Sequence, residues 1–333
     1  MRKRLFRERA VEQVSCQAAG VSEWPEAWEL AKKVAVFGAP TVRAVLLYGS
    51  HLHKAGPDPN SALDFVVVVE DYRAFYEGMA SWSELSRPVC VMTWMADRLP
   101  PNVIAFAPND GKGRIAKCLV ISKEHLAAAL GSRLPDHFVL GRMIQRIGYL
   151  WSRLPEDELW VREQIEGAHS RVLEWMAPHL NESFDGVLLG RRVLEVCYQG
   201  EFRPESQGRA ERIFQAQAAH FEKALLPALE SALASGTIVQ TAPGSYSLAE
   251  PLSLGARRRW KRYFGLSKTR ATLRWLKHSV TFAHWLPYVV RKAERHTGRT
   301  IRLTRLERAV PHIFCWPRAI YILASRSLKE VDK

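Results

Sequence analysis

The chain has 333 residues, of which 47% are hydrophobic and 25% charged, and these proportions exclude an intrinsically disordered protein. Its net charge of +14 predicts an anionic partner, such as nucleic acid or an anionic membrane surface. The five cysteines are scattered and form no CxxC pair, which argues against a disulfide framework or a zinc site and favours a reducing compartment. No apolar run reaches the ~18 residues that a membrane-spanning helix needs.

The N-terminal segment, residues 1 to about 40, is predicted to be helical. Its apolar side chains recur at helical spacing between Trp24 and Val34. The basic N-terminus is interrupted by Glu8 and Glu12, and no apolar core follows them. We therefore expect neither a secretory signal nor a transit peptide.

Two strands joined by a glycine turn are predicted next. Residues 44–48 form a short apolar run that is typical of a buried strand, and the run ends at Gly49-Ser50. A second apolar run covers residues 62–69 and carries Asp64 near its start. Because glycine has no side chain, the backbone at this turn can approach a ligand closely.

The following segment is predicted to mix helices and strands. We expect a helix at 72–83 and a strand at 88–94. Residues 102–122 contain two strand-like runs joined by a turn sequence rich in Gly, Asn and Asp, which is typical of a hairpin. Ser122 is placed to cap a helix over 123–130.

Residues 134–250 are predicted to form a helical region that ends in a hairpin. Apolar residues recur every three or four positions through most of this segment, as in the set Leu150, Trp151 and Leu154. Residues 236–250 then alternate around a Pro-Gly turn, as a small hairpin would. Helices followed by a hairpin predict a winged-helix-like domain.

The excess positive charge belongs to residues 251–333. This segment carries 20 Lys and Arg against 4 Asp and Glu, whereas residues 1–250 carry 28 against 30. Aromatic residues are interleaved with the cations, and Leu273, Leu276 and Val280 lie on one face of a predicted helix. The pattern is typical of an interfacial anchor, with aromatic rings at headgroup depth and cations against anionic lipid. A nucleic-acid-binding surface is the alternative.

Four short motifs occur in order between residues 44 and 205, and together they resemble those of a known family. They are Tyr48-Gly49-Ser50 with Leu63-Asp64-Phe65, Gly113-Arg114-Ile115-Ala116-Lys117 with the strand that ends at Ser122, Val139-Leu140-Gly141-Arg142, and Tyr198-Gln199-Gly200-Glu201-Phe202-Arg203. The series is similar to that of the mitochondrial-type phosphatidate cytidylyltransferases, also described as translocator assembly and maintenance proteins, and of their bacterial relatives.

This resemblance, together with the predicted elements and the charge distribution, predicts an α+β fold in three parts. These are a nucleotidyltransferase-fold mixed sheet in residues 1–133, a helical, winged-helix-like domain in residues 134–250 and a basic C-terminal helical segment in residues 251–333. It implies the Mg²⁺-dependent reaction of CTP with phosphatidate, which yields CDP-diacylglycerol and pyrophosphate in phospholipid synthesis. It also implies a cytoplasmic protein, peripherally associated with the inner face of the membrane, whose anionic partner is phosphatidate rather than nucleic acid.

The same resemblance assigns roles to individual residues. Gly49 would let the turn approach the triphosphate, and Ser50 would donate its hydroxyl and backbone N–H. Asp64 would hold Mg²⁺, which bridges phosphate oxygens, and Lys117 would offer a cation to the phosphates. The first expected catalytic set is therefore Ser50, Asp64 and Lys117, and the further nucleotide-binding candidates are Lys54, Arg142 and Arg203.

The chain departs from the superfold pattern at one important position. The superfold has a second carboxylate two residues after the first, on the same face of the strand, and here that position is Val66. Magnesium would then depend on Asp64, on phosphate oxygens and water, and on one distant acid such as Asp58 or Asp110. Mg²⁺ commonly accepts so few protein ligands.

Several alternatives stay open at the level of sequence. Arg142 and Arg203 could form interdomain salt bridges instead of binding phosphate, and Lys54 could be a solvated loop residue. The chain could be another enzyme of the nucleotidyltransferase superfold that acts on RNA, protein or a small molecule. It could also be a catalytically inactive nucleotide- or lipid-binding protein.

Overall fold

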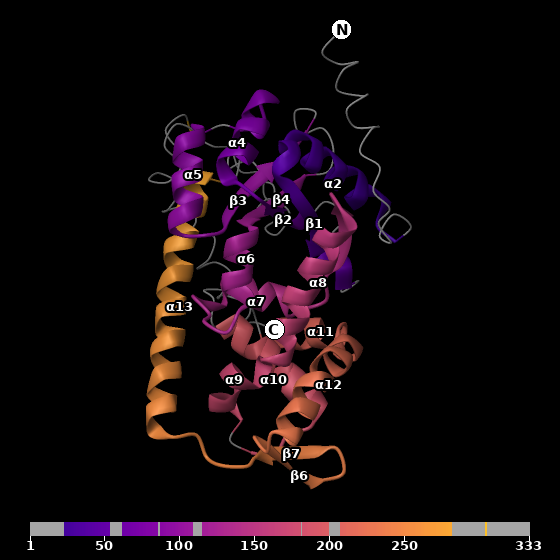
Figure 1. Ribbon diagram of the computed structural model, residues 1–333, viewed down its shortest axis with the longest axis vertical. Coiled ribbons are helices and arrows are strands. Elements are labelled where there is room, and N and C mark those ends of the chain that lie inside the picture. The colour runs from indigo at the N-terminus through magenta and orange to yellow at the C-terminus, as the bar shows by residue number, and fades with distance from the viewer. Residues whose placement is uncertain are drawn as a thin grey trace.

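The computed structural model describes residues 23–53, 62–85, 87–108, 115–180, 182–199 and 207–281, together with Thr304. Within these ranges the protein is a mixed α/β structure, with a five-stranded sheet, a helical region and a small two-stranded sheet. The last described helix, α13 (Leu254–Thr281), runs along the side of the molecule from the small sheet to α5 (Val89–Arg98) (Figure 1). The beginning of the predicted N-terminal helix and most of the tail after Thr281 lie outside the described residues.

The five strands of the large sheet are β1 (Val42–Tyr48), β2 (Leu63–Val69), β3 (Asn102–Phe106), β4 (Ala116–Ser122) and β5 (Gly148–Ser152). Their order is β3-β4-β2-β1-β5. β2 and β4 are parallel, and the other neighbours are antiparallel. The register pairs Tyr48 with Asp64 and Asp64 with Lys117. The end of β1 therefore meets the starts of β2 and β4 along one line across the sheet.

Helices cover both faces of this sheet, and each face buries its own core. Val66 and Val68 of β2 point into one core, whereas Phe65 and Val67 point into the other, because successive strand residues alternate between faces. The remaining helices are α2 (Pro25–Phe37), α3 (Ser50–His53), α4 (Tyr72–Ser81), α6 (Lys123–Leu130), α7 (His137–Met143), α8 (Pro155–Ser170), α9 (Val172–Met176), α10 (Gly186–Gln199), α11 (Gln207–Gln215) and α12 (Ala218–Ala234), with 3-10 turns η1 (Ala39–Thr41) and η2 (Ala177–His179). The first core contains residues of α6 to α12, and the second contains residues of α2 to α5.

Most of the predicted elements are confirmed with small shifts of their ends. The first two strands, α4 and the antiparallel pair β3 and β4 are present, and Ser122 caps α6 by accepting a hydrogen bond from the backbone N–H of His125 at 3.2 Å. The predicted C-terminal hairpin is β6 (Ile238–Ala242) with β7 (Ser245–Leu248). Its turn uses Gly244, whose φ of +74° favours glycine.

The predicted strand at 88–94 is wrong, because these residues begin helix α5. Within α5 only Met92 and Ala96 are buried, at a spacing of four residues, and Trp94 between them is 60% exposed. One buried stripe at this spacing is the pattern of a helix that lies on a surface. A short apolar run with β-branched residues fits a strand or a helix equally well before its packing is known.

The helical prediction for Leu150, Trp151 and Leu154 is also wrong. Leu150 and Trp151 belong to strand β5, which pairs antiparallel with β1 at the edge of the sheet, and Leu154 lies in the turn before α8. The three residues have helical spacing by coincidence, because the strand is only five residues long. The chain thus returns to the large sheet after α7.

Helix α13 packs with a polar, cationic face inward. Asp136, the N-cap of α7, is buried and receives two hydrogen bonds from the guanidinium of Arg274, at 2.6 and 3.0 Å, and one from Arg270 at 2.7 Å. Arg274 is only 2% exposed and also donates to the carbonyl oxygen of Pro100 at 2.7 Å. This cluster joins the C-terminal helix to the start of α7 and to the loop before β3.

The last turns of α13 continue the same polar contact along the edge strand β3. The ammonium of Lys277 donates to the carbonyl oxygens of Leu99 and Pro101, and Thr281 donates to the carbonyl oxygen of Val103 at 2.8 Å. Carbonyls at a sheet edge are strong acceptors that must be satisfied when they are buried. The last turns of α13 therefore hydrogen-bond to the loop before β3 through Lys277 and to β3 itself through Thr281.

The outward side of α13 is exposed and mixes apolar with polar residues, among them Lys268, Thr269 and Thr272. Leu273 and Leu276 lie on one face, as predicted, and with Leu266 and Trp275 they are 50 to 53% exposed. The prediction that the cations surround this face is wrong for Arg274 and Lys277, which are buried against the rest of the protein. Across the described part of the chain, no helix has both the length and the apolar character that a bilayer crossing demands.

Candidate functional site

The structure brings Gly49 and Asp64 into contact at the end of β1. Gly49 follows directly after Tyr48, which pairs with Asp64 across the two strands. Gly49 has a φ of +86°, in the left-handed region, and a Cβ atom at this position would lie 2.9 Å from Oδ2 of Asp64. Only glycine therefore fits the turn without moving the carboxylate. Ser50 begins the short helix α3 and is half-buried.

Lys117 lies beside Asp64 on the next strand. The two residues are register partners in the parallel pair of β2 and β4. Val66 and Leu119, two residues further along each strand, belong to the core beneath α6 and α7. Since side chains two residues apart share a face, Asp64 and Lys117 both lie on the face of the sheet that carries this helical core. Gly49, Asp64 and Lys117 are therefore brought together as predicted.

Among the described residues, the carboxylates that follow Asp64 in the sequence, Glu70 and Asp71, have partners elsewhere. Val66 is fully buried in the sheet, so no second carboxylate stands two residues after Asp64. Glu70 accepts a hydrogen bond from Nε of Arg43 at 3.1 Å, and Asp71 caps α4 by accepting from the N–H of Ala74 at 2.6 Å. Within the described ranges, no three His, Cys, Asp or Glu side chains cluster closely enough to hold a metal ion by themselves.

Arg142 lies on α7, which packs on the same face of the sheet. Its side chain is 7% exposed, and its guanidinium stands 3.8 Å above the ring of Phe138, close enough for a cation–π interaction. The guanidinium of Arg274 approaches the same ring at 4.8 Å. Phe138 thus holds two cations, one from α7 and one from α13. Arg142 also donates to the carbonyl oxygen of Phe138, and it is a buried cation on the face of the sheet that carries Asp64 and Lys117.

His278 of α13 completes this group, and sequence analysis did not predict it. Its ring lies 5.8 Å from that of Phe138. Burial lowers the pKa of His278 to about 2, and the positive charges of Lys277, Lys117, Arg142 and Arg274 act in the same direction. The imidazole is therefore neutral at physiological pH. The only signal in the sequence is its position four residues after Arg274, which has meaning only once the inward face of α13 is known.

Several predicted residues lie outside the described part of the chain. These are Lys54, Arg203, Asp58 and Asp110, and nothing in the structure tests their roles. The described site therefore consists of the Gly49 turn, the carboxylate of Asp64 and the cations of Lys117 and Arg142, all of which were predicted, together with His278, which was not.

The comparisons with known proteins do not extend these observations. No family model matches the chain, and no curated protein matches it. The family resemblance drawn from the four motifs therefore stays a prediction.

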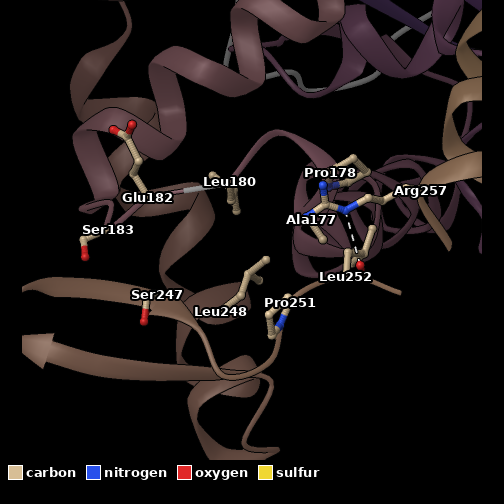
Figure 2. Close-up of a pocket in the computed structure, with 10 residues that line it drawn as sticks. All are labelled: Ala177, Pro178, Leu180, Glu182, Ser183, Ser247, Leu248, Pro251, Leu252 and Arg257. Carbon is tan, nitrogen blue, oxygen red and sulfur yellow. Dashed lines mark hydrogen bonds between the residues drawn. The ribbon is translucent and has the colours of Figure 1, made fainter. Parts of the chain in front are cut away.

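A separate cavity of about 460 Å³ lies between η2, the loop after it and the β6–β7 hairpin (Figure 2). Leu180, Leu248 and Leu252 form its apolar part, and Arg257 at its rim donates from Nε to the carbonyl oxygen of Leu252 at 3.2 Å (Figure 2). None of the candidate residues lines this cavity. It is distinct from the group at the end of β1.

Proposed function

We propose that the protein is a Mg²⁺-dependent CTP:phosphatidate cytidylyltransferase, built on a nucleotidyltransferase fold and associated peripherally with a membrane. The observation that carries the proposal is the glycine turn packed against Asp64, with Lys117 in register beside it. A turn that only glycine can occupy, next to a carboxylate and a lysine, suits a bound triphosphate with its metal ion. The four ordered motifs support phosphatidate as the acceptor.

The proposed reaction needs positioning and charge neutralisation more than covalent help from the protein. An oxygen of the lipid phosphate forms a bond to the α-phosphorus of CTP, and the bond from that phosphorus to the bridging oxygen breaks, which releases pyrophosphate. Ser50 donates hydrogen bonds to the triphosphate, and the cations of Lys117 and Arg142 offset its charge. In transfers of this kind, most of the rate enhancement comes from electrostatic stabilisation and from holding the attacking oxygen in line with the leaving oxygen.

The residues present fit a magnesium ion that is held mainly by substrate. Asp64 supplies one carboxylate beside the Gly49 turn, and the phosphate oxygens supply further ligands. When bound, Mg²⁺ would neutralise charge on the leaving pyrophosphate. Since Val66 offers no second carboxylate, we expect magnesium affinity to depend strongly on the nucleotide.

The second part of the proposed architecture is supported by α10 to α12 and the hairpin that follows them. β6 and β7 come directly after α12, and Phe184 bridges to Tyr246 of β7 through two backbone hydrogen bonds of 2.7 and 2.8 Å. Helices closed by a two-stranded hairpin are the elements of a winged helix, and we include this domain type in the proposal.

Membrane association is supported by the exposed side of α13. Leu273 and Leu276 lie side by side and face solvent, Trp275 next to them is also exposed, and the N-terminal half of the helix carries exposed Arg and Lys side chains. An exposed apolar patch with cations at its border suits an anionic lipid surface. Phosphatidate would be both the substrate and part of that surface.

Pyrophosphate release tests the proposed function. The purified protein should release pyrophosphate from CTP in the presence of Mg²⁺ and phosphatidate vesicles. We expect no release from ATP, GTP or UTP, and none from CTP with phosphatidylcholine vesicles. Release without lipid, or with another nucleotide, would assign the protein to a different acceptor within the nucleotidyltransferase superfold. Absence of release in every reaction would indicate an inactive binding protein.

Gly49→Ala should reduce turnover by about 100-fold, because a carboxylate displaced by about 1 Å costs this much in positioning. The added Cβ would come within 2.9 Å of Asp64 Oδ2, and the φ of +86° would strain the backbone by about 1–2 kcal/mol.

Gly244→Ala is the matched control for this substitution. Gly244 has a similar φ of +74°, but nothing lies within 4 Å of its added Cβ. It should lose similar stability in thermal unfolding and keep full turnover. Equal activity of the two variants would remove Gly49 from the site.

A further inference from the structure

The imidazole of His278 is half-buried between α13 and Phe138 of α7, and the proposed function has so far given it no role. Its Nε2 atom is buried and makes no hydrogen bond to any residue that the structure describes. A buried polar nitrogen without a partner is costly, and such atoms are rare in folded proteins unless a ligand or water pairs with them. Phe138 lies beside both His278, whose ring is 5.8 Å away, and the Arg142 guanidinium, which is 3.8 Å away.

The charges around His278 suit an anion. Lys277, Lys117, Arg142 and Arg274 all act on the imidazole with positive charge. Among these, Arg274 is paired with Asp136, and Lys277 is held by backbone carbonyls. In these surroundings the imidazole stays neutral and has one N–H donor and one acceptor nitrogen. A neutral donor can contact an anion without adding a further charge to a crowded cationic site.

We infer that His278 donates a hydrogen bond from Nε2 to a phosphate oxygen of the polyphosphate bound beside Asp64, Lys117 and Arg142. The C-terminal helix α13 would then form one wall of the site. The identification of the anion as a polyphosphate rests on the proposed function. A hydrogen bond to an ionised phosphate is about twice as strong as one between neutral groups, so a single imidazole contributes measurably to binding.

The packing of α13 holds His278 in place for this role. Arg274, one turn before it, is fixed by Asp136 and by the carbonyl of Pro100. Lys277, the preceding residue, donates to the carbonyls of Leu99 and Pro101. A binding residue whose backbone is fixed by its neighbours loses little entropy on contact with ligand.

The test compares His278→Leu with Thr281→Val for binding of inorganic tripolyphosphate by calorimetry. Leucine fills the space of the imidazole and removes its N–H. Thr281 is the matched control, because it is buried on the same face of α13 but donates to Val103 at the edge of the sheet. We expect His278→Leu to weaken tripolyphosphate binding about tenfold or more. Thr281→Val should stay within about twofold of the wild type.

Equal weakening in the two variants would show a structural role only, and this result would overturn the inference. Unchanged binding by His278→Leu, or no binding of tripolyphosphate to the wild-type protein, would also overturn it. If tripolyphosphate binding depends on His278 but CTP and phosphatidate give no pyrophosphate, the inference stands and the proposed function fails.

A spectroscopic measurement covers the case in which His278→Leu does not fold. The ring resonances of His278 in the wild-type protein can be assigned by comparison with His278→Gln. Titration with tripolyphosphate should shift these resonances at the same concentrations at which calorimetry detects binding. Resonances that stay fixed at saturation would contradict the hydrogen bond.

Discussion

Asp64→Ala is expected to lower pyrophosphate release by about 1,000-fold or more, because the described site contains no other carboxylate placed to hold the metal ion. Loss of the charge stabilisation that a bound metal provides costs several kcal/mol in the transition state. The same variant should keep its thermal unfolding midpoint within a few degrees, because Asp64 lies at the end of a strand and is only half-buried. An active Asp64→Ala variant would exclude this residue as the metal ligand.

Glu70→Gln is the control for the loss of a negative charge near the sheet. Glu70 follows the same strand and pairs with Arg43 at the surface, 3.1 Å away. Surface pairs of this kind contribute about 0–1 kcal/mol to stability. Turnover of Glu70→Gln should equal that of the wild type, so a shared loss of activity would point to a general charge effect instead of a metal site.

Asp136→Ala is expected to reduce the free energy of unfolding by about 3–5 kcal/mol, because it leaves the buried guanidinium of Arg274 without its partner. The substitution also removes the N-cap of α7, where Asp136 accepts from the N–H of Phe138 at 3.0 Å. Denaturant unfolding measures the loss. Asp185→Ala is the control, because Asp185 is an exposed residue that caps α10 through the N–H of Leu188. It should lose only about 1 kcal/mol.

The same carboxylate makes stability depend on pH. Burial alone would raise the pKa of Asp136, but the charge and hydrogen bonds of Arg274, with those of Arg270, lower it below the ordinary value of 3.8. A carboxyl group with a lowered pKa in the folded state stabilises the protein above its unfolded pKa. The free energy of unfolding should therefore decrease as the pH falls below about 4. In Asp136→Ala this decrease should be smaller, because the carboxylate that causes part of it is absent.

The centre of the sheet and of the site could be predicted from sequence because both follow from local rules. Apolar runs of strand length gave β1, β2 and β4, and a glycine turn between two strands placed Gly49 close to Asp64. Lys117 was predicted through the family motif, and the structure places it beside Asp64 because their two strands pair in parallel. Adjacent strands bring such residues together whatever covers the sheet.

The rest depended on packing that local patterns do not contain. The residues of α5 and β5 are short apolar runs, and their tertiary contacts decide whether they become helix or strand. The predicted strand at 88–94 and the predicted helix at Leu150 and Trp151 were therefore both wrong. Arg142 was predicted only through the family motif. His278 could not be predicted, since its role depends on α13 presenting its cationic side to the protein.

The orientation of α13 makes the two sides of one helix separable in experiment. A substitution such as Leu273→Ser on the outward side changes the exposed apolar surface that would contact lipid and leaves the interior contacts intact. Substitutions of Arg274 or Lys277 disturb the packing of α13 against the rest of the protein and leave its outward side chains unchanged. In the proposed function, one helix would therefore contact the lipid surface with one side and help to form the binding site with the other.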